Sequence, residues 1–293
     1  MNDGSAVLQQ RIASLQAYIG KMPALSPTVS KVMATCRNPD TSPADLTRII
    51  SMDPVLMGKI ISLINSAYYG FSQKITSLPH AIIMLGMNTI KNLVLSTAIL
   101  GNVNRLHHEQ VLDMDAFWQH SLSVGVTAKL LAEKRGVRQS LQETYFVAGL
   151  VHDIGKVAIN NRFPIIYSQA LETAGQKEVA LYRAERKVVG IDHASMGALI
   201  AAKWRLGDDI ADTIRYHHDL STYQGEHEEI VATVALANYI ANTLALGFSG
   251  DGFPDKISSE SLQRLRIPPA DFKEVAGAVN DEVNKARVFL GLT

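Results

Sequence analysis

The stretch Leu150-Val151-His152-Asp153-Ile154-Gly155-Lys156 places an adjacent histidine and aspartate inside a largely apolar run, 148–159. Two strongly polar side chains are costly to bury in such a run unless another group satisfies them. A divalent metal ion, a hydrogen-bond network or an anion bound near Lys156 would each do so. The surrounding apolar pattern predicts a helix over 145–160.

Outward from this stretch, signals for helix starts recur along the chain and strand signals are scarce. Ser42-Pro43-Ala44-Asp45 combines an N-cap residue, a proline at the first helical position and an acid in the first turn. Asp53-Pro54 and Ser77-Leu78-Pro79 repeat the arrangement before the next two apolar faces. We therefore predict an all-α protein. Further helices are expected at 87–100, 114–134, 191–204, 208–218, 229–246 and 269–290.

The predicted architecture is a two-part helical bundle, in which an N-terminal helical half packs on a second helical half. The polar stretch 104–109 marks the joint between them. The expected divisions are an N-terminal helix (1–20), the first half (21–104), the second half (105–246), and a flexible glycine-rich loop with a C-terminal helix (247–293).

Composition narrows the class of protein. Of 293 residues, 47% are hydrophobic and 19% charged, which is typical of a globular chain. The 28 basic and 28 acidic residues balance, so the overall charge gives no sign of a dedicated nucleic-acid binder. A single cysteine, Cys36, fits a reducing cytoplasm. No signal peptide is evident, and the uncharged run 230–250 contains Asn238 and Asn242, which favours a buried helix over a membrane span. We expect a cytoplasmic protein without membrane association.

Histidines concentrate in the second half, on helices expected to pack together. Imidazole and carboxylate groups suit a borderline divalent transition metal such as iron, zinc or manganese. Each residue alone is weak evidence, because a single buried histidine is often a hydrogen-bonded core residue. Together they predict a site for one or two ions. The candidate ligands are His120, His152, Asp153, His193, His217, His218 and Asn238.

Residues 120–238 resemble the HD superfamily of metal-dependent phosphohydrolases, whose pattern is a histidine, a His-Asp pair and a distant aspartate. His120, His152 and Asp153 match the first three positions, and Asn238 stands where the family has the aspartate. The resemblance implies an HD-like helical fold for the second half. Three further residues resemble the histidines that the HD-GYP branch of this superfamily uses for a second metal ion: His193, His217 and His218.

Four segments narrow the resemblance to the HDOD domain, a signalling relative of the HD hydrolases. The similarity covers about 20–245 and implies a bacterial regulatory protein in signal transduction. Its partners would be signalling proteins or a phosphate-containing small ligand, and many members of the family are thought to have lost catalysis. The segments are Pro23-Ala24-Leu25-Ser26-Pro27, Asp53-Pro54-Val55-Leu56, Asn65-Ser66-Ala67-Tyr68-Tyr69-Gly70 and Ile83-Met84-Leu85-Gly86.

The resemblance leaves two functions open. In an active enzyme, Asp153 would ligate and bridge metals during metal-assisted phosphoester hydrolysis, and Lys156 would contact a substrate phosphate or else be a solvated residue. Asn238 offers no negative charge, and the sequence after His218 lacks the Gly-Tyr-Pro of cyclic di-GMP phosphodiesterases. We therefore expect a binding protein with a partly retained metal site and little or no hydrolase activity. The alternative is an active phosphohydrolase or phosphodiesterase on a nucleotide or cyclic nucleotide.

Two patterns in the first half could indicate a function, and each has a structural alternative. Residues 41–70 could form a DNA-binding helix-turn-helix, but the expected second helix carries only one basic residue, Lys59, and recognition helices need side chains for phosphates and base edges. In the HDOD-like signature, Asn65 could bond to backbone at a helix end and Gly70 could cap it, while Tyr68 and Tyr69 pack. The role of this signature stays open.

Overall fold

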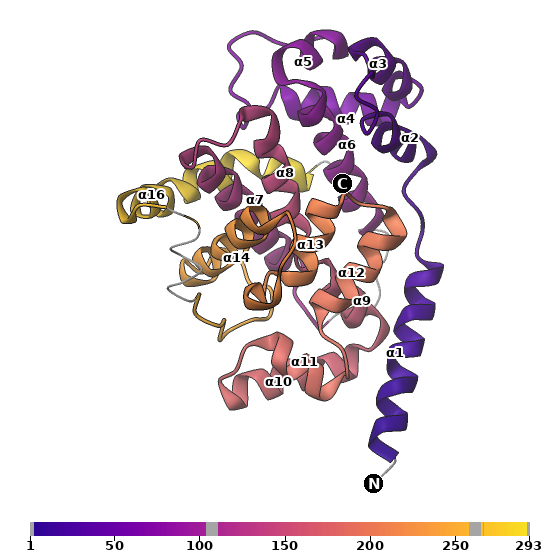
Figure 1. Cartoon of the computed structure of the whole chain (residues 1–293), viewed down its shortest axis with the longest axis vertical. Coiled ribbons are helices and arrows are strands. Elements are labelled where there is room, and N and C mark those ends of the chain that lie inside the picture. The colour runs from indigo at the N-terminus through magenta and orange to yellow at the C-terminus, as the bar shows by residue number, and fades with distance from the viewer. Residues whose placement is uncertain (1–2, 104–110, 258–264, 266, 292–293) are drawn as a thin grey trace.

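The computed structural model describes residues 3–103, 111–257, 265 and 267–291. Within these ranges every regular element is a helix, as the sequence predicts. In Figure 1 the helices of residues 27–85 lie at one end of the molecule, the helix of residues 3–21 runs along the side of the body, and the helices of the second half form that body. The first helices are α1 (Asp3–Lys21), α2 (Pro27–Thr35), α3 (Pro43–Ser51), α4 (Pro54–Ile64), α5 (Leu78–Leu85) and α6 (Met87–Val103).

The second half is built around α7, which packs against α8 and α14 and against α16 from the C-terminal division. A helical turn, η2, precedes α14. These elements are α7 (Met114–Lys134), α8 (Gln139–Val151), α9 (Ile154–Arg162), α10 (Pro164–Lys177), α11 (Leu181–Val188), α12 (His193–Trp204), α13 (Asp208–Tyr216), η2 (Leu220–Thr222), α14 (Glu228–Thr243), α16 (Pro269–Ala286) and α17 (Val288–Gly291).

The predicted helix starts in the first half are confirmed. Ser42 and Asp45 form a reciprocal capping box at the start of α3, with each side chain accepting a hydrogen bond from the other's backbone amide at 3.2 Å. The Asp53 carboxylate accepts a hydrogen bond from the amide of Leu56 at 3.0 Å and begins α4 in the same way. These two caps satisfy amides that have no partner inside the helix, whereas α5 begins after Ser77 without a side-chain capping hydrogen bond.

The prediction of one continuous helix over 145–160 is wrong. Helix α8 ends at Val151 and α9 begins at Ile154, so His152 and Asp153 lie at the junction between two helices. Apolar residues continue on both sides of the break, and their periodicity does not reveal it. Gly155 permits the new direction, because a Cβ atom there would lie 1.9 Å from the carbonyl oxygen of His193 at the start of α12. The bend brings the two backbones together.

Other boundaries also differ from the sequence-based expectation. The C-terminal helix is split into α16 and α17, and the helix expected at 191–204 begins at His193 after the N-cap Asp192. Helices α10 and α11 were not predicted. A signal for α11 was present, because Leu181, Ala184 and Val188 recur at helical spacing among its charged residues.

The two halves share one continuous apolar core. It runs from Leu15 in α1 through Ile60 in α4 and Phe146 in α8 to Phe289 in α17. Polar contacts add to the join, since the indole of Trp204 donates to the carbonyl of Pro23 at 3.0 Å. The expected joint at 104–109 lies outside the described residues, so the boundaries given for the divisions of the chain stay predictions.

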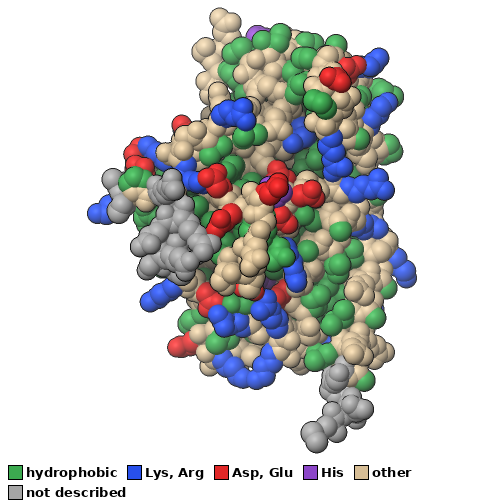
Figure 2. All heavy atoms as spheres, in the orientation of Figure 1, with side chains coloured by type: hydrophobic (Ala, Val, Ile, Leu, Met, Phe, Trp, Pro, Cys, Tyr) green, Lys and Arg blue, Asp and Glu red, His purple; other side chains and the backbone are tan. Residues whose placement is uncertain are grey.

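In the part of the chain that the structure describes, no single helix is long and apolar enough to cross a membrane. Helices α5 and α6 pass that test only as a pair, and they are bent by 114° at their junction. Charge is unevenly spread over the face shown in Figure 2. Acidic side chains gather near its middle, and basic side chains gather at the end where α10 and α11 lie.

Candidate metal centre

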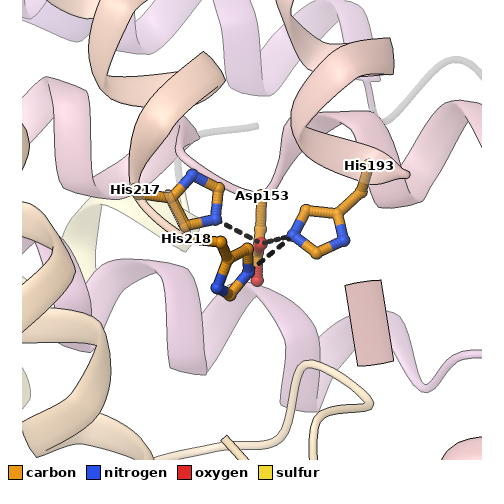
Figure 3. A group of neighbouring side chains, drawn as sticks. All are labelled: Asp153, His193, His217 and His218. Atoms are coloured by element: carbon orange, nitrogen blue, oxygen red, sulfur yellow. Dashed lines mark hydrogen bonds and ion pairs between the residues drawn. The ribbon is translucent and has the colours of Figure 1, made fainter. Parts of the chain in front are cut away.

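Three helix ends bring four polar side chains to one point. Asp153 lies at the junction of α8 and α9, His193 is the first residue of α12, and His217 and His218 follow α13. Helix α12 packs against both α9 and α13, which closes the arrangement. Figure 3 shows the three imidazole rings around the carboxylate of Asp153. Residues distant in sequence therefore meet because of helix packing.

The distances within this group suit a common ligand. The Nε2 atoms of His193 and His217 lie 3.1 and 3.6 Å from Oδ1 of Asp153, and the Nε2 atoms of His193 and His218 are 3.0 Å apart. One ligand atom from each of the four residues lies within 4.8 Å of the other three. Asp153 and His193 are fully buried.

A second group shares the same aspartate. His120 from α7 and His152 also bring ligand atoms within 4.8 Å of Asp153, and His152 Nε2 lies 3.3 Å from its Oδ2. Asn238 from α14 lies beside them, with its Oδ1 3.0 Å from His120 Nε2. All seven sequence-predicted ligands therefore meet in one region, where six are buried and His218 is partly exposed. Metal binding by them stays a prediction.

The hydrogen bonds of two rings fit metal ligation. His152 donates from Nδ1 to the carbonyl of Gly149 at 2.7 Å, and His217 donates from Nδ1 to that of Ile214 at 3.0 Å. In neutral rings this leaves both Nε2 atoms with a lone pair directed toward the Asp153 carboxylate. Neither Nε2 has a hydrogen-bond partner. Buried lone pairs facing a carboxylate are unfavourable unless a cation lies between them.

Glu185 in α11 is a site residue that the sequence-based interpretation missed. It is fully buried, and its Oε2 accepts hydrogen bonds from His193 Nδ1 at 2.6 Å and from the His193 amide at 2.8 Å. A carboxylate behind a histidine orients the ring and raises the basicity of the opposite nitrogen. In the sequence, the charged residues of α11 favour a solvent-exposed segment, so they give no sign that Glu185 is buried. The available signal was that Glu185 shares the face of Leu181.

Lys156 is buried beside Asp153, so the interpretation as a solvated residue is wrong. Its ammonium lies 2.7 Å from Asp153 Oδ2 and donates to Ser249 Oγ at 3.0 Å. Ser249 belongs to the glycine-rich loop expected to be flexible, 247–254. The buried Asp251 of this loop also accepts a hydrogen bond from the amide of Leu181 at 3.2 Å. The loop thus covers one side of the site, and its mobility stays a prediction.

Electrostatics hold several of these groups in the form that binds metals. Burial lowers the pKa of His120 to about 3 and that of His217 to about 4, so both rings are neutral at pH 7. Burial would raise the pKa of Asp153, but His152, Lys156 and His193 outweigh it and hold that pKa well below its usual range. Neutral imidazoles and an ionised carboxylate are the ligating species.

His193 behaves differently from the other rings. Burial alone would lower its pKa, but the carboxylates of Glu185 and Asp153 outweigh burial and raise the pKa to about 9. In the metal-free protein the ring is therefore protonated at neutral pH. A cation bound at its Nε2 would displace that proton, so metal uptake at this position is coupled to proton release.

The lowered pKa values predict acid sensitivity in chelator-treated protein. Unfolded chains protonate histidine near pH 6.5, whereas folded His120 and His217 stay neutral down to about pH 3 and about pH 4. Between these pH values the unfolded state binds more protons than the folded state. As the pH falls from 6.5 to the folded pKa, each ring therefore lowers the free energy of unfolding by about 1.4 kcal/mol per pH unit. Guanidinium denaturation at several pH values in this window measures the loss.

Matched variants separate these two rings from other acid effects. We expect His217→Asn to flatten the pH dependence, and the exposed His80→Asn to leave it unchanged. Protonated His193 stabilises the folded chain below pH 6.5, because its pKa is raised to about 9. This contribution to the free energy of unfolding is lost as the pH rises from 6.5 to about 9. Equal stability of the parent protein at pH 6.5 and 4.5 would contradict the predicted acid sensitivity.

A cavity of about 410 Å³ opens beside His217 and His218. Asn238 and Tyr239 of α14 form one part of its wall, and the side chains of Arg183 and Lys256 form another. A small ligand could therefore reach the histidines from this side. Arg183 and Lys256 could neutralise an anion there, but Asp219 and Asp255 also line the cavity, and Arg183 already pairs with Asp255 at 2.7 Å.

Comparison with known proteins decides the family. The model of the HDOD domain family matches residues 22–220. The chain belongs to the HDOD family. An HDOD domain protein of unknown function from Geobacter sulfurreducens has 24% identity and a TM-score of 0.76, and the match covers 95% of this chain and 98% of that one. A candidate phosphohydrolase from Shewanella amazonensis SB2B has 21% identity and a TM-score of 0.64, with 96% and 93% covered.

A curated relative extends the comparison beyond solved structures. An uncharacterized protein of Treponema pallidum (strain Nichols) is 25% identical over 226 residues, or 77% of this chain. This HDOD chain spans 43% of the length of that relative. The structural matches show that the all-α HDOD fold is shared, as the sequence motifs predict.

Proposed function

We propose that this chain is a bacterial HDOD signalling protein that binds divalent transition metal at the Asp153 cluster and acts by binding partners. The observation that carries the proposal is the pair of buried Nε2 atoms, on His152 and His217, that face one shared carboxylate without hydrogen-bond partners. Its partners would be other signalling proteins or a phosphate-containing small ligand, in the cytoplasm.

The ligand set suggests one or two ions of iron, manganese or zinc. Asp153 with His193, His217 and His218 would hold one ion. Asp153 with His120 and His152 would hold the other, beside Asn238. When bound, such an ion offsets negative charge on a phosphoryl group and lowers the pKa of water. Glu185 would orient His193 toward the ion through its hydrogen bond to Nδ1.

Two features favour a binding role over hydrolysis. Asn238 contributes a neutral carbonyl oxygen, so the ion beside His120 lacks one anionic ligand. Lys156 already neutralises one oxygen of Asp153 from inside the cluster and donates to Ser249, so its ammonium has two protein partners. Both features reduce the negative charge available to a metal, and the second also leaves Lys156 less free to hold a substrate phosphate.

The second candidate is an active phosphohydrolase on a nucleotide or cyclic nucleotide. The cavity beside His217 and His218 favours it, because basic side chains there could hold a phosphate next to the ions. In that case Asp153 and Lys156 would be the catalytic residues. Asp153 would bridge the ions, and Lys156 would balance charge on the phosphoryl oxygens.

Metal analysis followed by an activity screen tests the proposal. Protein purified without chelator should contain transition metal by elemental analysis. It should hydrolyse phosphomonoesters, cyclic nucleotides and nucleotides no faster than the Asp153→Asn variant. Absence of metal, also after reconstitution, would overturn the metal assignment. Metal-dependent turnover that is lost in Asp153→Asn would favour the phosphohydrolase.

The variant Asn238→Asp is expected to bind metal more tightly than the parent chain. Asn242 donates to Asn238 Oδ1 at 2.8 Å, and it can donate equally to an aspartate, so the new carboxylate should keep the same orientation toward His120. An added anionic ligand should lower the dissociation constant about tenfold or more. Competition with a fluorescent chelator measures this constant. Equal affinity would show that residue 238 does not contact the ion.

A further inference from the structure

A second cavity, of about 510 Å³, lies between the two halves of the chain and away from the Asp153 cluster. Tyr68, Tyr69 and Phe71 line it from the segment after α4, and Lys129 of α7 and Glu143 of α8 line it from the second half. None of its lining residues belongs to the groups around Asp153. Its volume lies within the usual range of small-molecule sites.

The ammonium of Lys129 is already used within the protein. It forms an ion pair with Glu143 Oε1, and it lies 4.4 Å from the ring centroid of Tyr68 and 5.3 Å from that of Tyr69. Among the described residues lining the cavity, Lys129 is the single cation. An anionic ligand would therefore have to compete with a buried carboxylate for this positive charge.

Two hydrogen-bond acceptors in the lining, in contrast, have no donor. Glu143 is 3% exposed, and its second oxygen, Oε2, has no hydrogen-bond partner. The hydroxyl of Tyr68 is also buried without a partner. Glu133 and Glu282 add two further carboxylates to the lining, but Glu282 already pairs with Lys285 at 2.6 Å, so with this pair counted the excess is one negative charge. A buried, unpaired carboxylate oxygen is costly, and N–H donors would satisfy it.

The aromatic rings supply a surface for the body of a ligand. Tyr68 packs edge-on against Tyr69 and Phe289, with centroid distances of 5.2 and 5.4 Å. These contacts fix the ring of Tyr68 between the two halves. Ring faces attract organic cations through their quadrupoles, in addition to the apolar contact they provide.

We propose that this cavity binds a small organic cation with an apolar or planar body and N–H donors, such as an amine, amidine or guanidine. Its N–H groups would donate to Glu143 Oε2 and the Tyr68 hydroxyl, and Glu133 would balance its charge. Nucleotides and other anions are disfavoured by the same carboxylates. This site is distinct from the metal cluster and does not depend on it.

The proposal gives a role to the signature 65–70. Asn65 is structural, because its side chain exchanges hydrogen bonds with the backbone of Ile75 at 2.7 and 2.8 Å and so anchors the loop after α4. The predicted backbone role of Asn65 is confirmed. The anchored loop presents Tyr68 and Tyr69 to the cavity, where packing alone does not account for the buried Tyr68 hydroxyl.

Three ligands of nearly equal size test the charge preference. Benzamidine, benzamide and benzoate share one ring and are cationic, neutral and anionic at pH 7. Titration calorimetry of the full chain should give benzamidine an affinity about tenfold or more above that of benzamide, because charge-assisted hydrogen bonds to a carboxylate exceed neutral ones. Benzoate should not bind. Tighter binding of benzoate than of benzamidine, or no binding of benzamidine at millimolar concentration, would overturn the proposal.

Two variants locate the binding in this cavity. Tyr68→Phe removes an unpartnered hydroxyl, so the ligand-free protein should melt at the same or a higher temperature while benzamidine binds about fivefold more weakly. Glu133→Gln, at an exposed position, should weaken benzamidine severalfold, and the exposed control Glu226→Gln should not. Unchanged benzamidine affinity in both Tyr68→Phe and Glu133→Gln would place the cation elsewhere and overturn the proposal.

Discussion

Asp153→Asn is expected to abolish metal binding at both proposed positions, because Asp153 is common to the two groups of side chains that could hold an ion. The amide keeps the shape of the side chain and loses its charge. We expect elemental analysis of protein purified without chelator to find less than about a tenth of an equivalent of transition metal, since a deprotonated anionic ligand is needed at both positions. The exposed Asp281→Asn should retain the parent metal content.

Folding must be separated from metal binding in this experiment. Asp153→Asn leaves the buried Lys156 ammonium without its carboxylate, and breaking a buried ion pair costs about 3–5 kcal/mol. The double variant Asp153→Asn with Lys156→Met removes the unpaired charge and should recover much of this stability. It should still contain no metal. Metal retained at the parent level in either variant would exclude Asp153 as the shared ligand.

Gly155→Ala is expected to disrupt the centre without altering any ligand. An added Cβ would lie 1.9 Å from the carbonyl oxygen of His193 and 2.6 Å from the amide of Gly197, so α9 and α12 would have to separate. Because backbone atoms cannot rotate away as side chains do, we expect a loss of about 3 kcal/mol or more in the free energy of unfolding. Denaturant titration measures it, and metal content should fall with it.

A second glycine provides the matched control. Gly277 lies at an exposed position in α16, and nothing lies within 4 Å of the place its Cβ would take. Gly277→Ala should leave metal content unchanged and stabilise the chain by up to about 1 kcal/mol, because alanine loses less backbone entropy in a helix. Equal stability of Gly155→Ala and Gly277→Ala would show that α9 and α12 can separate without cost.

Local sequence signals predicted much of the fold. Proline after Ser42 and Asp53 marked the starts of α3 and α4, because capping depends on neighbouring residues alone. The predicted bounds of α7 agree with the structure at both ends. The break at His152 was missed because the contact that accompanies it, the close approach of Gly155 to His193, involves residues far apart in the chain.

The candidate site was likewise predicted in its residue types but not in its long-range contacts. The identities of the histidines, Asp153 and Asn238 predicted which chemistry the chain could support, because ligand type limits the choice of metal. The partners of these residues could not be predicted. Glu185 behind His193 and Ser249 beside Lys156 are ordinary polar residues in sequence, and only burial makes their contacts important.

The sequence by itself determined that this protein is all-α, that it carries the HDOD motifs, and which side chains are available to a metal. These properties depend on periodicity, caps and residue identity, which are local. Only the tertiary structure decided that Asp153 lies between two histidine groups, that Lys156 is buried against it, and that Tyr68 and Glu143 share a cavity. The physical reason is that burial and convergence depend on helix packing, which joins residues whose separation along the chain contains no information about their distance in space.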